Sequence, residues 1–202
     1  MTKLRTAVIG LVAPGLALAI VPAVLVAGDG AVAITTADPA CGDDSGAIYV
    51  DCGNGTVTDN RTGLVWLAAA DCWGEVTWPE AVRITANLGD VPDTSAAAAD
   101  DCGLSDGSLP GDWRLPTLGE FEAMVADALA CTPTITDDAG SGCWMEGVGT
   151  SFTGIQSDFY WSASVLSSTP ANAWAINLGN AGMAASGPQT AIHDVWAVRT
   201  SQ

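Results

Sequence analysis

Six cysteines constrain the fold of this chain more than any other feature, because all of them follow an apolar N-terminal segment. They are Cys41, Cys52, Cys72, Cys102, Cys131 and Cys143. An even number of cysteines in an exported chain is typical of a disulfide framework. Many connectivities are open, and pairing of sequence neighbours is the simplest: Cys41–Cys52, Cys72–Cys102 and Cys131–Cys143. A zinc or iron–sulfur site is disfavoured, because no Cys-x-x-Cys spacing occurs and the single histidine lies far along the chain.

The first 33 residues have the pattern of a secretory signal peptide. Lys3 and Arg5 precede an apolar run over residues 7–27, and Ala31-Val32-Ala33 supplies a small-x-small cleavage pattern. The alternative is a retained N-terminal anchor, since a run of about 20 apolar residues is long enough to span a membrane. We therefore expect an extracellular, cell-surface or periplasmic protein. A polar leader over residues 34–51 and one domain over residues 52–202 follow.

The charge of the mature chain excludes several classes of partner. Cleavage after Ala33 leaves four arginines and no lysine. Of the 23 acidic residues only Asp29 is removed, so 22 remain and the formal charge is −18. Such a chain repels nucleic acid and anionic lipid, so membrane contact is expected only if the N-terminal segment is retained. The charge favours cations and basic partners, or serves solubility alone.

Short β-prone runs and two amphipathic patterns predict an α+β fold. Residues 56–58 and 64–66 flank a turn at 59–63 and predict a hairpin, with Gly63 suited to a positive φ. Further strands are expected over residues 159–164, 173–179 and 193–200, with a turn at 179–182 between the last two. The helices are separated in sequence from most strands, which is typical of α+β proteins.

Both predicted helices begin with a capping box. Thr77 and Glu80 open a helix over residues 77–89, and Thr117 and Glu120 open one over residues 117–130. Gly89 is placed to end the first helix. The apolar faces are expected to comprise Trp78, Ala81, Val82, Thr85 and Leu88 in the first helix, and Leu118, Phe121, Val125, Ala128 and Leu129 in the second.

The segment Asp112-Trp113-Arg114 raises the choice between a ligand site and a structural contact. It stands just before Leu115-Pro116 and the second capped helix. A tryptophan at such a junction buries a large area, and the planar guanidinium of Arg114 is suited to pairing with a carboxylate such as Glu120 or Asp112. We therefore interpret the segment as structural.

The loop over residues 90–112 carries the candidate calcium ligands. They are Asp93, Asp100, Asp101 and Asp106. Calcium takes carboxylate and carbonyl oxygens, but the spacing does not match the Asp-x-Asp-x-Asp-Gly loop. The alternative is a solvated acidic loop. No other cofactor is expected.

Two of the eight tryptophans are candidate ligand residues. Trp73 and Trp144 each follow a cysteine in a loop of glycine and acidic residues. They are either packed on disulfides or exposed as an aromatic platform for a sugar or a protein partner. Asn177 and Asn180, in the turn at 177–182, and the loop over residues 147–158 join them as candidates for the ligand surface. His193-Asp194 resembles the base and orienting acid of a hydrolase, but no Gly-x-Ser-x-Gly elbow accompanies it, so catalysis is not expected.

Four segments in order resemble the Lcl C-terminal domain family. They are GNGTVTDNRTGLVW, TWPEAV, DWRLPTLGEFEAM and YWSAS…AWAINLG…VWAVR, and together they cover residues 54–199. The resemblance implies a C-type-lectin-like fold, with two helices packed on a small antiparallel sheet, and export to the cell surface or periplasm. The family includes adhesins that bind glycans, and it implies no general catalytic activity. This chain departs from the collagen-like adhesin of the family because it has no Gly-x-y repeat and is strongly acidic, so binding of sulfated polyanions is not transferred.

These observations favour a non-catalytic binding or adhesion module whose ligand is a glycan or a protein. One alternative is a structural subunit of a surface assembly. Another is an enzyme of the formylglycine-generating type, which shares the lectin-like topology and uses cysteines with a metal. Free thiols separate these hypotheses, because six paired cysteines leave no catalytic thiol.

Overall fold

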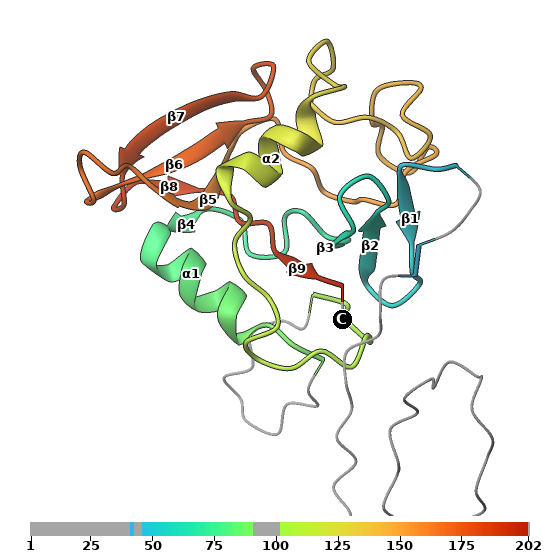
Figure 1. Cartoon of the computed structure of the whole chain (residues 1–202), viewed down its shortest axis with the longest axis horizontal. Coiled ribbons are helices and arrows are strands. Elements are labelled where there is room, and N and C mark those ends of the chain that lie inside the picture. Colours follow the sequence, from blue (N-terminus) through green and yellow to red (C-terminus); the bar gives the residue numbers. More distant parts are fainter. Residues whose placement is uncertain (1–40, 43–45, 91–101, 202) are drawn as a thin grey trace, which may run out of the picture. The chain divides into compact units, whose positions relative to one another are not determined.

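The computed structural model describes residues 41–42, 46–90 and 102–201 of the 202-residue chain. One sheet has four antiparallel strands in the order β1-β2-β3-β9 (Figure 1): β1 (Tyr49–Asp51), β2 (Thr56–Asp59), β3 (Leu64–Leu67) and β9 (Val198–Thr200). The first and last described strands thus form the two edges of one sheet.

Two smaller antiparallel sheets complete the strands. One pairs β4 (Val76–Thr77) with β8 (Ile192–His193). The other has three strands in the order β5-β6-β7: β5 (Phe159–Val165), β6 (Asn172–Asn177) and β7 (Met183–Pro188). Helix α1 (Trp78–Asn87) contacts β4 and β5, and helix α2 (Leu118–Val125) contacts β5 and β6. The predicted α+β class is confirmed, but the strands form three sheets rather than one.

The predicted hairpin is present, and the predicted leader is not entirely loose. β2 and β3 pair around a turn in which Gly63 has a φ of +70°. Within the leader, Tyr49–Asp51 forms β1 and pairs with β2. Tyr49 is buried and packs edge-on against Phe152, with ring centroids 4.9 Å apart. The apolar burial of this ring explains why a polar segment ends as a strand.

The C-terminal strands pair differently from the prediction. The turn at residues 179–182 joins β6 to β7, a strand that the sequence did not indicate. β7 reads MAASGP, which has no β-branched or aromatic residue, and it lies at the edge of its sheet, where burial is low. β9 instead crosses to pair with β3.

The two helices differ at their N-termini. Thr117 caps α2 as predicted, since its side chain accepts from the Glu120 amide and the Glu120 carboxylate accepts from the Thr117 amide. Thr77 makes no side-chain cap hydrogen bond in α1, and the Glu80 carboxylate accepts from Arg83. The predicted capping box of α1 is therefore wrong.

The helix ends also differ from the prediction. Gly89 follows α1 without a positive φ, and its lack of a side chain matters because a Cβ there would lie 2.9 Å from the Ser108 carbonyl oxygen. α2 ends at Val125, and a tight turn then leads to Cys131, so Leu129 is 57% exposed rather than buried. On α1, Ile84 is buried where Val82 was expected.

Tryptophans and other aromatic rings dominate the core. Trp196 contacts Trp66, Phe152 and Tyr160, with ring centroids 4.9–5.9 Å apart. A second buried cluster surrounds Trp161 and includes residues of α1. These large buried rings contribute most of the apolar area that stabilises so small a domain.

All three predicted disulfides form: Cys41–Cys52, Cys72–Cys102 and Cys131–Cys143. Disulfides of this kind are typical of an oxidising, extracellular-type environment. No helix within the described residues has the length and apolarity needed to cross a membrane. Residues 1–33, where a signal peptide or anchor is predicted, lie outside the described part.

Candidate functional site: an acidic pocket

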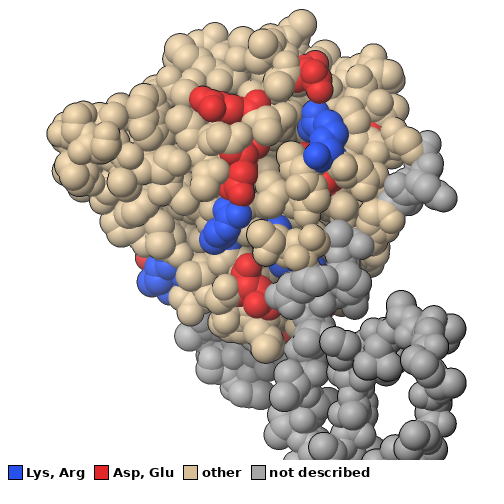
Figure 2. Space-filling view, viewed as in Figure 1, with Lys and Arg blue, Asp and Glu red and all other residues tan. Residues whose placement is uncertain are grey.

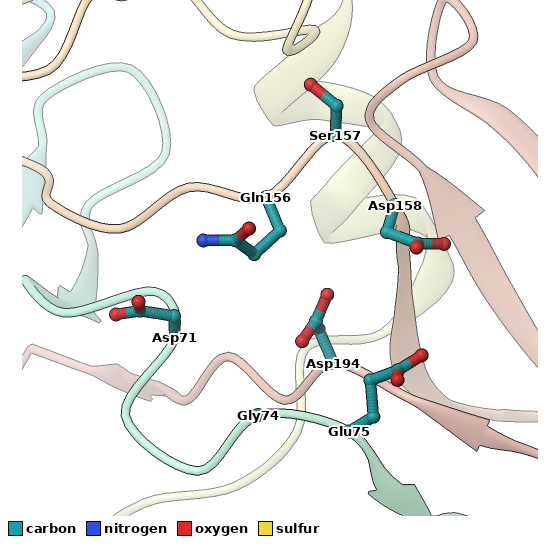
Figure 3. A pocket seen from close by; sticks show the side chains of 7 residues that line it. All are labelled: Asp71, Gly74, Glu75, Gln156, Ser157, Asp158 and Asp194. Carbon is teal, nitrogen blue, oxygen red and sulfur yellow. The ribbon is translucent and has the colours of Figure 1, made fainter.

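A pocket of about 630 Å³ opens between three chain segments that are distant in sequence. Figure 3 shows the side chains that line it: Asp71, Gly74, Glu75, Gln156, Ser157, Asp158 and Asp194. The first three residues lie in the connection from β3 to β4, the next three precede β5, and Asp194 follows β8. Four of the seven are carboxylic acids, so the lining is strongly anionic.

The wall formed by residues 71–75 is held by backbone bonds and a disulfide. The Ala70 amide donates to the Thr153 carbonyl at 2.9 Å, and the Thr153 amide donates to the Ala68 carbonyl at 2.9 Å. Cys72, directly after Asp71, is bonded to Cys102. These contacts fix the start of the segment, and the pairing of Val76 with His193 fixes its end.

A glycine makes room for the Asp71 carboxylate. Gly154 has a φ of +67°, and a Cβ at this position would collide with the carboxylate oxygens of Asp71. Any other residue would meet both the backbone strain and the collision. The sequence thus keeps Asp71 against the neighbouring segment.

The opposite wall, residues 156–158, is equally well fixed. The Gln156 amide donates to the Tyr160 hydroxyl at 2.8 Å, and the Leu178 amide donates to the Asp158 carbonyl at 2.9 Å. Gly179 lies so close to the Ser157 carbonyl that a Cβ there would collide with it. The wall is therefore packed against the start of the β6–β7 turn.

Asp194 lies in the middle of the pocket, between the other carboxylates (Figure 3). Its backbone is bound to β5, since its carbonyl accepts from the Trp161 amide at 3.0 Å and its amide donates to the Phe159 carbonyl at 2.9 Å. The residue is only 5% exposed. Nevertheless, no described residue donates a hydrogen bond to its carboxylate or forms an ion pair with it.

The surroundings of Asp194 disfavour its ionised form. Burial, followed by the negative charges of Glu75, Asp158 and Asp71, raises the pKa of Asp194 to about 6. His193, the preceding residue, does not act as its counter-ion, because burial lowers the pKa of the histidine more than Asp158 and Glu75 raise it. The His193 ring instead packs against Trp161, with centroids 4.3 Å apart. The predicted absence of a His–Asp hydrolase pair remains a prediction.

The arginines of the described residues are all engaged elsewhere. Figure 2 shows arginines beside acidic side chains on one face of the molecule. The ion pairs are Arg61 with Asp59 and Asp127, Arg83 with Glu80, Arg114 with Glu120, and Arg199 with Asp106. The pocket therefore has no internal cation, and an external one would meet unneutralised charge.

The pocket is not arranged as a metal cage. Within residues 41–42, 46–90 and 102–201, no three side chains of the histidine, cysteine, aspartate or glutamate type converge closely enough to hold a metal ion. The carboxylates line a wide space, which is suited to a larger cationic group.

The segment Asp112-Trp113-Arg114 has the structural contacts that were predicted. Trp113 is 1% exposed, and its Nε1 donates to the Ser108 hydroxyl at 2.9 Å. Arg114 donates to both Glu120 carboxylate oxygens, at 2.7 and 2.8 Å. This bidentate pair joins the entry of α2 to its first turn.

The candidate tryptophans do not form an exposed platform. Trp144 is 9% exposed, and its Nε1 donates to the Phe152 carbonyl at 3.1 Å. Trp73 is half-buried and packs against both core clusters. Of the two alternatives for Trp144, a packed ring agrees with its burial, and a ligand role for Trp73 stays a prediction.

The candidate asparagines lie near the pocket but do not line it. The Asn177 Oδ1 accepts from the Gly179 amide at 2.8 Å and so shapes the turn. Asn180 is exposed, with its Nδ2 3.6 Å from the Met183 sulfur. Gly179 brings this turn against Ser157, so the two asparagines flank one wall.

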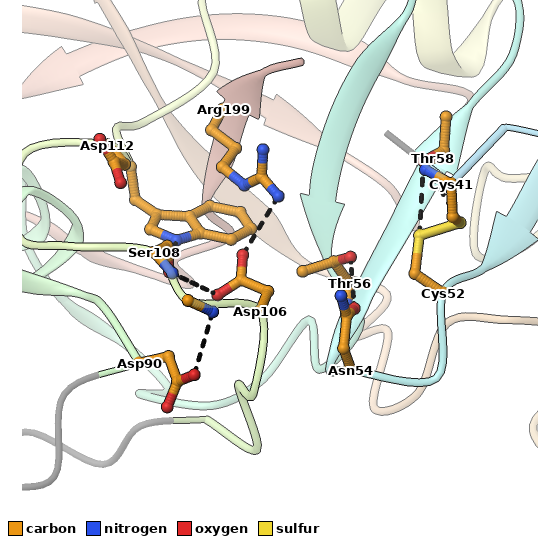
Figure 4. A network of polar contacts seen from close by, with 12 residues as sticks. Cys41, Cys52, Asn54, Thr56, Thr58, Asp90, Asp106, Ser108, Asp112 and Arg199 are labelled. Atoms are coloured by element: carbon orange, nitrogen blue, oxygen red, sulfur yellow. Dashed lines mark hydrogen bonds and ion pairs between the residues drawn. A yellow bond between two sulfur atoms is a disulfide. The ribbon is translucent and has the colours of Figure 1, made fainter. Parts of the chain in front are cut away.

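Of the calcium candidates, only Asp106 falls within the described residues. Figure 4 shows its carboxylate between Arg199 and Ser108. The Arg199 guanidinium lies 3.2 Å from Oδ2, and Oδ1 accepts from the Ser108 hydroxyl at 2.6 Å and from the Ser108 amide at 3.0 Å. Asp106 is thus a buried structural residue rather than a free ligand. Asp93, Asp100 and Asp101 lie outside the described residues, and calcium binding there stays a prediction.

Sequence reasoning found one wall of the pocket, since the candidate loop over residues 147–158 ends with its residues 156–158. It missed Asp71 and Glu75, which stand in an unremarkable loop, and it considered Asp194 only as part of a catalytic pair. No local pattern identifies them, because their proximity depends on the pairing of β4 with β8 and on the contact of residue 194 with β5.

One family model matches the part of the chain that forms these elements. The model of the Lcl C-terminal domain matches residues 55–199, which is well over half of the chain and spans β2 to β9. A comparison with curated proteins gave no match. The chain therefore belongs to the Lcl C-terminal domain family.

Proposed function

We propose that this chain is an exported, non-catalytic binding module with a C-type-lectin-like architecture. It acts outside the cell, at the cell surface or in the periplasm, and its ligand is a glycan or a protein. The observation that carries the proposal is the acidic pocket, in which Asp194 is 5% exposed and its carboxylate has no partner among the described residues.

The pocket has the construction expected of a binding site. Its residues come from loops, and each loop is fixed to strands by backbone hydrogen bonds. Function on loops held by a rigid scaffold is the usual arrangement, because the scaffold limits the entropy lost on binding. An unpaired buried carboxylate destabilises a fold, so its presence in a cleft supports a role in recognition.

The cysteines favour binding over catalysis of the formylglycine-generating type. All six are in disulfides, and no described cysteine is free. A mechanism that needs a thiolate has no group to supply it here. The same disulfides support export, since they persist in oxidising compartments.

The test is a binding screen with the exported protein. We expect saturable binding to members of a glycan array or to proteins of a surface-protein panel, with no turnover of the bound ligand. The signal should fall when Asp194 is replaced by asparagine, and it should persist in Glu122→Gln, which removes an exposed charge on α2. Absence of binding to both classes would contradict the proposal.

Thermal melts with calcium, added to the same screen, test whether the acidic loop over residues 90–112 binds this ion. A rise of several degrees in melting temperature in millimolar calcium would show a site in the folded state by mass action. Loss of that rise in a variant lacking Asp93, Asp100 and Asp101 would assign it to this loop. An unchanged melting temperature would leave the loop as a solvated acidic segment.

A further inference from the structure

We propose that the acidic pocket binds a primary ammonium group, presented by a lysine side chain of a partner protein, and that the Asp194 carboxylate accepts its hydrogen bonds. The proposal rests on the proposed binding function and names the chemical class of its ligand. It is carried by the placement of Asp194, which is buried at 5% exposure, directed into the pocket and unpartnered among the described residues (Figure 3).

The charge around Asp194 selects a cation. Asp71, Glu75 and Asp158 surround it, and the described arginines are paired with other carboxylates. A neutral or anionic ligand would leave the Asp194 carboxylate buried without compensation, whereas a cation would offset both its burial and its repulsion from the other acids.

The shape of the pocket favours an ammonium over a metal ion. No three acidic or imidazole side chains within the described residues converge closely enough to coordinate a metal. An alkylammonium is larger and donates hydrogen bonds in three directions, so it can contact carboxylates that lie on different walls.

An ammonium also fits better than a guanidinium. The planar fork of a guanidinium matches one carboxylate face to face, as Arg114 does with Glu120 at 2.7 and 2.8 Å. Asp194 is instead one of several acids at different heights around an open space, with the Gln156 side chain above it in the view of Figure 3. A compact charge with rotatable donors suits this arrangement.

A protein is the expected source of the ammonium group. The mature chain has a formal charge near −18 if cleaved after Ala33, with its four arginines against 22 acids, and therefore attracts basic protein surfaces over long distances. A pocket of about 630 Å³ is large enough to admit a lysine side chain together with part of its neighbours.

Release of the Asp194 proton on binding provides an independent signature of the ammonium ligand. The titratable groups that face Asp194 from the elements packed around it are Asp71, Glu75, Asp158, His193 and the neutral Tyr160 phenol, whose pKa is raised by burial. Because the pKa of Asp194 is about 6, the ligand must displace its proton at low pH, while a lysine ammonium stays charged throughout. Affinity should rise about tenfold between pH 5 and pH 7.

The experiment is calorimetric titration of the full exported chain with blocked peptides at pH 7. The probes are a lysine peptide, its norleucine and acetyl-lysine analogues, n-butylammonium, spermidine and calcium. We expect the lysine peptide to bind and both uncharged analogues to fail. If n-butylammonium and spermidine bind as tightly as the peptide, the source is a free amine rather than a protein, which overturns that part of the proposal.

Matched variants locate the binding. Asp194→Asn should weaken binding about tenfold or more, since it replaces a charge-assisted hydrogen bond by a neutral one. Asp137→Asn should not, because Asp137 lines a second pocket of about 430 Å³ and its carboxylate already accepts from Ser141. Both variants are checked for folding by thermal melts.

Three outcomes would overturn the proposal. They are equal binding of the norleucine peptide, calcium binding that depends on Asp194 in the absence of ammonium binding, and no ammonium binding at all. If the ligand screen succeeds with a partner whose affinity is unchanged in Asp194→Asn, the binding function stands and this inference fails.

Discussion

Asp106 and Asp194 are two buried aspartates with opposite surroundings. Asp106 is 1% exposed and has Arg199 and Ser108 as partners, so its charge is compensated within the protein. Asp194 is 5% exposed and faces three other acids across a pocket. Buried charges are usually paired, because an unpaired one costs several kcal/mol. The difference separates an aspartate that is compensated within the fold from one that is not, and the second is the residue to which we assign ligand binding.

The residues around Asp106 show which contacts compensate a buried carboxylate charge. The Arg199 guanidinium lies over the Trp113 ring at 5.5 Å, and the Trp113 Nε1 donates to the same Ser108 hydroxyl that donates to Asp106. The network connects β9 to the segment before α2 (Figure 4). No equivalent set of donors surrounds the Asp194 carboxylate in the described residues.

The largest effect is expected from breaking the compensated pair. Asp106→Asn removes the carboxylate whose Oδ2 lies 3.2 Å from the buried Arg199 guanidinium, which should lower the free energy of unfolding by about 3–5 kcal/mol. Urea unfolding at pH 7 measures the loss, with the exposed Glu122→Gln as the control. A loss below about 1 kcal/mol would contradict the structural role of Asp106. Replacing both partners with apolar residues, Asp106→Leu with Arg199→Met, should cost less than the single change.

Replacing Asp194 by asparagine should have the opposite effect and raise the free energy of unfolding at pH 7. Its pKa of about 6 lies above the ordinary value, so the folded protein binds the proton more tightly than the unfolded chain. The fold is therefore stabilised by protonation below about pH 4, and this stability is lost as pH rises through about 6. The full shift corresponds to about 3 kcal/mol, and solvent access through the open pocket reduces the expected gain of Asp194→Asn at pH 7 to about 1–2 kcal/mol.

A pH series separates this gain from other effects of the substitution. The advantage of Asp194→Asn over the wild type should shrink as pH falls from 7 to 5 and vanish near pH 4, because the wild-type carboxyl is then protonated. Thermal melts of both proteins across this range give the difference. A constant advantage at all pH values would mean that packing, not charge, is responsible.

A smaller effect is expected where an ion pair is half-exposed. Burial alone would raise the pKa of Glu120, but hydrogen bonds from Arg114 and Thr117 outweigh it, and the pKa is lowered. The carboxylate therefore stabilises the fold above the ordinary pKa of a glutamate, and this contribution is lost as pH falls through the lowered value. After discounting for solvent screening, Glu120→Gln should cost about 0.5–1 kcal/mol in urea unfolding at pH 7. A loss as large as that of Asp106→Asn would show that solvent exposure does not determine how much each ion pair contributes to the free energy of unfolding.

The smallest effect is expected at the surface of α1. Arg83 donates to Glu80 from an exposed position, with the Nε–Oε2 distance at 2.9 Å. Solvent and salt screen such a pair almost completely. Glu80→Gln should leave the melting temperature unchanged within error in 0.15 M salt, while a clear shift would mean that surface charges influence the fold more than their exposure indicates.

The comparison also shows which parts of the molecule were predictable from sequence. The disulfide pairs, the β2–β3 hairpin and the α2 capping box depend on residues close together in the chain, and all were predicted correctly. Pairing of β9 with β3 depends on packing between distant segments, and it was missed. β7 was missed although it pairs with its neighbour β6, because its sequence has no β-branched or aromatic residue.

The candidate site was harder to predict for the same reason. Asp106 and Asp194 look alike in the sequence, each a lone acid near a polar neighbour. Only the fold places Arg199 beside one and Asp71, Glu75 and Asp158 beside the other. The burial of Trp144 stayed open in the sequence, because a tryptophan beside a cysteine has the same local sequence whether it is buried or exposed.

The most direct test of the contrast is the titration of the Asp194 carboxyl itself. Carbon-13 NMR of aspartate-labelled protein, with Asp194→Asn to assign the signal, gives its pKa with and without the blocked lysine peptide. The account predicts a pKa of about 6 in the free protein and a marked fall when the ammonium is bound. An unperturbed pKa that does not respond to the cation would contradict the claim that Asp194 is an uncompensated charge awaiting a ligand.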